Sequence, residues 1–331
     1  MLLTKMNSYQ LPVENRGGME DFLSSNSLVE FSALELLHAV VTCTFPASRV
    51  LDGYTRKRRE ELYAKCAMME AALIQNEEYF GKSPVIGYLD SVEKTAVSYY
   101  LGLIFTKLVS ARVFHEDFLT HVQLIHRENG EYFFYIGRKK RSEMLSYQLG
   151  QEGFSVWAAR GRSNNSLDAL QEGLSQAQEI RAVQGMAPRM RAVCMTYYEK
   201  GIFSARVQRS AKQGTEDLDF TEKEYLRAYY QPVRELLLEF YNREEMRECR
   251  IQGIDCVEAR VTLPYFIRED APDEVERSFI LGMPRDLIES PLQSFADIPQ
   301  KWRRLREGLW ERDGEDCYAG GDFVYVRLEA S

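Results

Sequence analysis

The sequence predicts an α/β protein, and segments in the middle of the chain carry this prediction. Ser91 to Phe114 is a long apolar run of helical character. Two short β-rich runs follow, Met144 to Leu149 and Phe154 to Ala159, joined by the glycine-containing turn at 150–153. An amphipathic helix is expected after Ser166, and a further strand after that helix. Strand signals also precede these two runs, between residues 119 and 137. We therefore take the order as helix, strand, strand, strand, helix, strand.

Length and composition fit this class. The chain has 331 residues and is 45% hydrophobic, so it can bury a large core as one elaborate domain or two. Its net charge is −8. A chain with this balance is not a general polyanion binder, and any contact with nucleic acid requires a local basic patch.

The N-terminal part is expected to be helical. Residues 1–26 are polar and contain glycine, which predicts a flexible arm. Leu28 to Phe45 has apolar residues at helical spacing and ends before a proline, and Tyr54 to Asn76 is expected to form a second, highly charged helix. We therefore take 27–118 as a helical N-terminal region.

The third predicted helix, Ser91 to Phe114, is apolar nearly all round, so we expect it to be buried against the sheet. Ser91 is a plausible N-cap, and Glu93 would lie near the positive end of the helix dipole. Gly102 lowers the helix propensity, which suggests close packing of the backbone at that point.

Residues 119–331 are expected to hold the α/β core with a C-terminal extension of strands and helices. The other predicted strands are Leu119–His126, Glu131–Gly137, Met190–Tyr198, Ile202–Val207, Ile254–Leu263 and Phe323–Leu328. The other predicted helices are one capped by Ser166 that runs to about Val183, a long one from Glu222 to about Arg243, and a short one at Trp302–Trp310.

Two of the predicted strands carry a recognisable pattern. Ser142-Glu143 opens the first, and Trp157-Ala158-Ala159-Arg160 closes the second, just before Gly161-Arg162-Ser163. This arrangement resembles the core of the PD-(D/E)xK family, which has the restriction-endonuclease-like fold. The resemblance implies an αβββαβ core, the same order of elements that periodicity and turns predict.

The resemblance also implies a damaged nuclease site. In active members two carboxylates hold Mg²⁺ and the lysine positions or deprotonates water. Glu143 could still be a ligand, but Ala158 stands in place of the second carboxylate and offers no oxygen. Arg160 keeps the charge of the lysine, yet it stays protonated and cannot act as a base. We therefore expect lost catalysis and retained anion binding, without a cofactor.

Basic residues surround this pattern. Arg138, Lys139, Lys140 and Arg141 precede it, and Arg160 with Arg162 lie at the end of the second strand. If the strands pair, these cations converge near one edge and would attract phosphates of DNA or RNA. The alternative is a solvated hairpin whose charges protect an edge strand.

Polar residues of the following helix, Gln171, Gln176 and Gln178, either join the site, as the resemblance allows, or form a solvated face. His115, His121 and His126 lack the spacing of a helical metal pair, so metal binding by them is disfavoured.

The six cysteines form no CxxC, which favours buried reduced thiols. The N-terminus lacks the apolar region of a signal peptide, and no run of 18 residues is apolar without charges. We therefore expect a cytoplasmic protein without a membrane partner.

The function that the sequence favours is a catalytically inactive nuclease-like protein. It would bind nucleic acid, or serve as a scaffold for a partner subunit, in the restriction, repair or phage-defence systems where active relatives cut DNA. One alternative is an active Mg²⁺-dependent endonuclease that combines Glu143 with another carboxylate, such as Glu131 or Glu172. The other is a protein-interaction module with no role in nucleic-acid binding.

Overall fold

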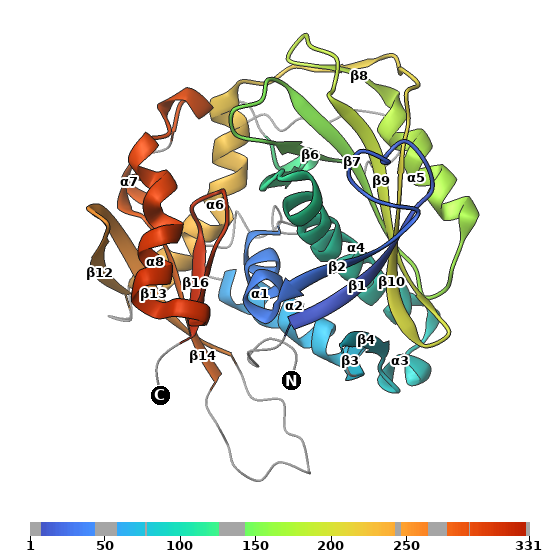
Figure 1. The fold of residues 1–331 in the computed structure, drawn as a ribbon, viewed down its shortest axis with the longest axis horizontal. Coiled ribbons are helices and arrows are strands. Elements are labelled where there is room, and N and C mark those ends of the chain that lie inside the picture. Colours follow the sequence, from blue (N-terminus) through green and yellow to red (C-terminus); the bar gives the residue numbers. More distant parts are fainter. Residues whose placement is uncertain are drawn as a thin grey trace.

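The structure, a computed structural model, describes residues 8–43, 58–76, 78–125, 143–241, 246–263, 277–290 and 292–328. It confirms a mixed α/β protein, with helices packed around a large sheet and a second sheet near the C-terminus (Figure 1). The expectations for His126, Glu131, the predicted strand 131–137 and the basic run 138–141 concern residues outside these ranges.

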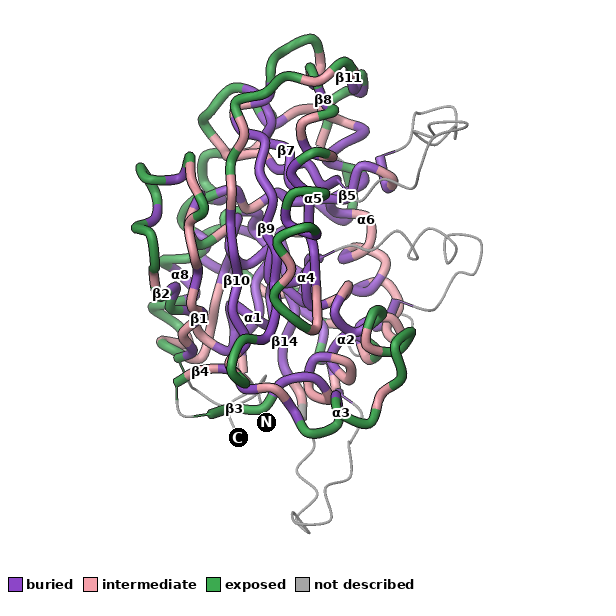
Figure 2. Tube along the Cα trace, turned by 90° about the vertical axis from the view of Figure 1, so that its right-hand side faces the viewer, coloured by how far each residue is buried: buried purple, intermediate pink, exposed green. Residues whose placement is uncertain are grey.

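Within the described residues, nine strands form one mixed sheet. In sheet order they are β2 (Asn26–Ser32), β1 (Ser8–Asn15), β4 (Tyr79–Lys82), β10 (Ile202–Arg209), β9 (Met190–Glu199), β7 (Phe154–Gly161), β6 (Glu143–Tyr147) and β5 (Phe118–His121), with β3 (Leu73–Asn76) paired to β4. The central strands are buried along most of their length (Figure 2).

The middle of this sheet has the predicted order of elements. β5, β6 and β7 form an antiparallel meander. Helix α5 (Leu167–Glu179), with Ser166 as its N-cap, follows β7 and leads to β9, which is parallel to β7. β10 then pairs antiparallel with β9. The predicted strands β6, β7, β9 and β10 are confirmed, and they pair as two antiparallel hairpins.

The remaining helices match the predicted ones in part. They are α1 (Ala33–Thr42), α2 (Arg58–Ala72), α3 (Val85–Tyr88), α4 (Ser91–Phe114), α6 (Glu222–Tyr241), α7 (Arg285–Glu289) and α8 (Leu305–Asp313), with 3₁₀ turns at Val122–Leu124, Phe295–Asp297, Gln300–Arg304 and Gly314–Asp316. The strand predicted at 119–126 ends at His121, and the first of these turns follows from Val122.

Helices α4 and α5 lie on opposite faces of the sheet (Figure 1). Phe114 of α4 packs edge-on against Trp157, whereas Gly173 of α5 lies beside Val193 and Arg160. Among the described residues α4 is the one helix apolar and long enough to cross a membrane, but 72% of its most apolar window is buried inside the protein. This burial is that of a core helix, as predicted. Its N-cap is Asp90 rather than Ser91.

The N-terminal segment differs from the expected flexible arm. Ser8–Asn15 forms β1, which pairs antiparallel with β2 and parallel with β10. Tyr9 and Leu11 are fully buried. The partner strand β10 lies far along the sequence, so no local pattern announces this pairing. The large sheet therefore draws strands from both sides of residue 118.

The predicted start of the first helix, at Leu28, is also wrong. Residues 26–32 form strand β2, in which Val29 and Phe31 are buried while Leu28 is 55% exposed. The helix α1 begins only at Ala33, where Ser32 and Glu35 form a reciprocal capping box. This S-x-x-E signature in the sequence marks the true helix start.

The C-terminal part forms a separate antiparallel sheet. In sheet order its strands are β12 (Met246–Ile251), β13 (Ile254–Leu263), β14 (Arg277–Pro284), β16 (Tyr325–Leu328) and β15 (Cys317–Ala319). The helix expected to run to Val183 ends earlier, because Ile180–Val183 is the short strand β8, paired with β11 (Glu216–Leu218).

Candidate functional site at the end of strand β7

The β6–β7 hairpin places the two halves of the sequence pattern side by side. Glu143 lies directly opposite Ala158 in the antiparallel register. Arg160 is two residues further along β7 and so lies on the same face of the sheet as Ala158. Diagonal neighbours of this kind have Cα atoms about 7–8 Å apart. The prediction that these two strands are adjacent and antiparallel is confirmed, and Glu143 and Arg160 share one edge of the hairpin.

Arg160 is held between the sheet and α5. Its Nη1 donates to the carbonyl oxygen of Ala159 at 2.9 Å, and its Nη2 donates to the side-chain oxygen of Gln176. The residue is only 7% exposed. Burial lowers the pKa of its guanidinium, the charge of Glu172 opposes this shift, and Arg162 adds to it. Arginine nevertheless stays protonated in proteins, so Arg160 can bind an anion but cannot accept a proton.

Gln176 joins Arg160, so the expected solvated face of α5 does not extend to this residue. Gln178 instead donates to the hydroxyl of Ser210 at 2.6 Å, and Gln171 donates to the side chain of Gln208 at 3.2 Å. A polar residue of the helix therefore reaches the site, as the resemblance allows.

Glu143 is fully buried, and its carboxylate is close enough for its charge to raise the pKa of Arg160. The facing position carries only the methyl group of Ala158. Among the residues that the structure describes, no group of three or more His, Cys, Asp or Glu side chains is arranged to hold a metal ion. The carboxylate of Glu143 thus lies within range of the charge of Arg160, and Ala158, which faces Glu143, carries no oxygen.

A cleft of ≈ 620 Å³ opens beside this pair. It is lined by the first half of α4, the end of β7 and Glu172 of α5. Arg162, whose side chain is 39% exposed, reaches the cleft and lies 3.9 Å from the Glu172 carboxylate. Because Glu172 is itself 62% exposed, a phosphate could replace it as the partner of Arg162.

A larger cavity of ≈ 740 Å³ lies elsewhere, between α1, α8 and β15. Its charged lining residues are Arg112, Arg306, Glu35, Glu307, Glu311 and Glu315. Carboxylates outnumber arginines there, so this cavity is less suited to phosphate than the cleft beside β7.

Another buried carboxylate lies near the hairpin but on the opposite face. Glu116, 3% exposed, accepts hydrogen bonds from the hydroxyls of Ser146 and Ser155 at 2.5 Å each and from the indole of Trp157 at 2.8 Å. Because side chains alternate along a strand, Trp157 faces away from Ala158. Glu116 therefore cannot supply the ligand that Ala158 lacks.

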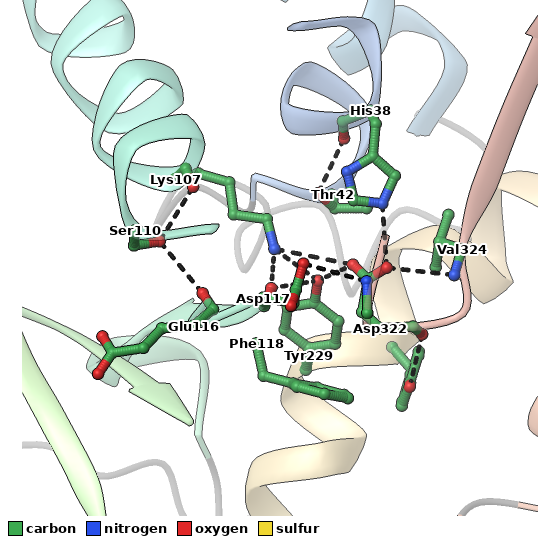
Figure 3. Close-up of polar contacts among 12 residues, drawn as sticks. His38, Thr42, Lys107, Ser110, Glu116, Asp117, Phe118, Tyr229, Asp322 and Val324 are labelled. Carbon is green, nitrogen blue, oxygen red and sulfur yellow. Dashed lines mark hydrogen bonds and ion pairs between the residues drawn. The ribbon is translucent and has the colours of Figure 1, made fainter. Parts of the chain in front are cut away.

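The sequence analysis missed a buried polar cluster, which we call the Lys107–Asp322 cluster (Figure 3). Its members come from α1, α4, the segment before β5, α6 and the turn between β15 and β16. They are His38, Lys107, Asp117, Tyr229 and Asp322.

Asp322 is the centre of this cluster. Its Oδ1 lies 3.0 Å from His38 Nε2, its Oδ2 lies 3.7 Å from Lys107 Nζ, and the Tyr229 hydroxyl donates to it. Burial alone would raise the pKa of this carboxyl, but His38, Lys107 and the hydrogen bonds from His38 and Tyr229 outweigh burial and hold it at about 2.

The side chains of His38, Lys107 and Asp322 are at most 3% exposed, which closes them to any substrate. We interpret the Lys107–Asp322 cluster as a structural joint that fixes the C-terminal sheet to the helices of the large sheet. Its members come from five distant segments, so the sequence holds no local signal for it.

Comparison with protein-family models, with curated proteins and with solved structures gives no match to this chain.

Proposed function

We propose that the protein is a catalytically inactive nuclease-like protein that binds nucleic acid at the end of strand β7. The observation that carries the proposal is the register of the hairpin. Glu143 faces Ala158 across the two strands, and Arg160 follows on the same face. These positions correspond to those of the two carboxylates and the lysine in the PD-(D/E)xK pattern.

The topology around the hairpin supports the proposal. Helix α4 precedes the antiparallel meander of β5, β6 and β7, and α5 then connects β7 to the parallel strand β9. The resemblance to the restriction-endonuclease-like family implies this order of elements, αβββαβ, so the order supports the proposal. Fold alone does not fix a function, so the proposal depends on the chemistry of the site.

That chemistry favours binding over cleavage. Mg²⁺ needs oxygen ligands, and Ala158 supplies none. Arg160 retains a permanent charge and cannot activate water. Arg162 adds a second guanidinium at the mouth of the cleft, where a phosphate group from solution can reach it. In the sequence, Arg138 to Arg141 directly precede β6 and add four further cations.

The test is a gel-shift titration of the pure protein with DNA and with RNA. We expect binding at about 50 mM salt that weakens by orders of magnitude at about 200 mM, because each neutralised phosphate releases counterions. The double variant Lys139→Glu/Lys140→Glu should abolish it. The control, Lys212→Glu/Lys301→Glu, makes the same charge change at two exposed lysines and should bind nearly as well as the wild type.

Two outcomes would count against the proposal. Binding that is absent at low salt, together with tight association with another chain, would favour the scaffold of a partner subunit. If both double variants lose nucleic-acid binding equally, the binding depends on the net charge of the protein and not on this site. The cytoplasm remains the compartment in which we place this function.

A further inference from the structure

The C-terminal sheet carries a pair of cysteines in direct opposition. Cys249 of β12 and Cys256 of β13 are register partners in the antiparallel hairpin. The hairpin is closed by Gln252 and Gly253, which both have positive φ, at 48° and 75°. Two such residues are typical of a type I′ turn, which fixes the register of the strands.

This opposition meets the geometry of a disulfide. Directly opposed residues of antiparallel strands have Cα atoms about 4.5–5.5 Å apart and side chains on the same face. Disulfides occur at Cα separations of about 4.4–6.8 Å. The Cys256 side chain is close enough to lower the pKa of the Cys249 thiol. A disulfide between Cys249 and Cys256 can therefore form without a rearrangement of the two backbone strands.

The surroundings of Cys249 make it the more reactive of the two thiols. It lies half-buried on the edge strand, whereas Cys256 is fully buried. The hydrogen bond with Cys256 lowers the pKa of Cys249, burial and the charge of Glu258 oppose this, and Tyr325 and Arg312 act in the same direction as Cys256. The same pairing raises the pKa of Cys256.

Tyr325 of β16 reaches the sulfur atom of Cys249 across the sheet. Its hydroxyl lies 3.7 Å from Cys249 Sγ and 3.1 Å from the carboxylate of Glu258. To reach them the tyrosine ring crosses β14 at Gly282, where a β-carbon would overlap the ring. The absence of a side chain at Gly282 is thus a condition for the contact.

In the other four cysteines burial outweighs the charges and hydrogen bonds that favour a thiolate. Burial raises the pKa of Cys43, Cys66 and Cys194 to about 12, and that of Cys317 to about 11. Thiolate, not thiol, is the reactive form of cysteine. Cys249 is therefore the preferred point of attack among the six.

We propose that Cys249 and Cys256 are a modification site, which hydrogen peroxide converts to a reversible disulfide across the β12–β13 hairpin. The Cys249 thiolate attacks one oxygen of the peroxide, the O–O bond breaks, and the leaving hydroxide takes a proton to become water. The sulfur of Cys256 then attacks the resulting sulfenic acid, expels its hydroxide, and loses its own proton to form a second water. Two thiols are oxidised by two electrons and one peroxide is reduced.

The test treats the reduced full-length protein with hydrogen peroxide, alkylates the remaining thiols after denaturation, and maps the modified peptides by mass spectrometry. We expect two of the six cysteines to escape alkylation, with a crosslink between the peptides of Cys249 and Cys256 that dithiothreitol reverses. Cys256→Ser should stop the reaction at a sulfenic acid on Cys249, which dimedone labels. Cys317→Ser, which changes another half-buried cysteine, should leave the crosslink unchanged.

Other results would overturn the proposal. These are oxidation of a different cysteine first, survival of all six thiols under conditions that oxidise free dithiothreitol, or equal protection from alkylation in Cys249→Ser. The wild-type map alone decides the first two, so the proposal stays testable even if a variant folds poorly. Its outcome is independent of nucleic-acid binding.

Discussion

Gly102 in α4 lies against Gly161 at the end of β7, so close that a β-carbon on Gly102 would be 2.6 Å from the amide nitrogen of Gly161. A β-carbon on Gly161 would in turn overlap the carbonyl oxygen of Ser98. The helix and the strand thus meet backbone to backbone, immediately beside Arg160. The close packing that Gly102 suggests in the sequence is confirmed, and it sets the position of α4 against the candidate site.

Gly102→Ala should destabilise the protein although alanine is the better helix former. The gain in helix propensity is about 1 kcal/mol, whereas overpacking a core typically costs about 1–3 kcal/mol. The control, Gly87→Ala in α3, has no atom within 4 Å of the new β-carbon and should be neutral or slightly stabilising. Urea unfolding followed by tryptophan fluorescence measures both. Equal free energies of unfolding in the two variants would contradict the contact.

Asp322→Asn should lower the free energy of unfolding by about 3–5 kcal/mol, the usual cost of breaking a buried ion pair. The change leaves Lys107 buried without its full counter-charge, since the Lys107 side chain is 0% exposed. Asp21→Asn, at an exposed position, should have little effect. The same urea titration checks both, and a loss below about 1 kcal/mol, the net value of one ordinary hydrogen bond, would exclude the proposed joint.

A further buried carboxylate, that of Glu258, predicts how stability depends on pH. Burial would raise the pKa of Glu258, but hydrogen bonds and charges of Arg327 and Arg312 hold it at about 2. The unfolded value is about 4.3. A depressed pKa in the folded state stabilises the protein above the unfolded value, and this contribution is lost as pH falls from about 4.3 through about 2.

Glu258→Gln should therefore be less stable than the wild type at neutral pH and should show a shallower loss of stability between about pH 5 and pH 2. The variant keeps the shape of the side chain but removes the buried carboxylate that Arg327 and Arg312 share, so that Asp313 is their remaining partner. Glu78→Gln, at an exposed position, serves as the control. Parallel acid profiles for Glu258→Gln and the wild type would contradict the assignment.

The parts of the fold that the sequence predicted well are those with short-range signals. The hairpin of β6 and β7 joins two apolar runs through a glycine turn, and helix α4 is a continuous apolar segment. The parts it missed are set by distant partners. Strand β1 is polar on one side and finds its partner β10 only in the folded chain, at pairs such as Val13 with Ala205.

In the candidate site, too, the contacts with short-range signals could be predicted, and those set by distant partners could not. Glu143, Ala158 and Arg160 could be placed together, because a hairpin register follows from the turn that closes it. The contact of Arg160 with Gln176 depends on how α5 packs on the sheet, which periodicity does not specify. Asp322 and Lys107 meet only because the turn between β15 and β16 reaches α4, so neither residue had a sequence pattern to reveal the contact.

The last prediction concerns catalysis. We expect no Mg²⁺- or Mn²⁺-dependent cleavage of plasmid DNA by the pure protein, measured as conversion of supercoiled plasmid to nicked or linear forms. Glu143 faces the methyl group of Ala158, so the second oxygen ligand is missing, and Arg160 cannot take a proton from water near neutral pH. Any trace of nicking should be equal in Glu143→Ala, which would identify it as contamination. Metal-dependent nicking that Glu143→Ala removes, while Glu78→Ala retains it, would instead identify an active endonuclease that recruits its missing carboxylate from elsewhere, and Glu172 beside Arg162 would be the first residue to replace.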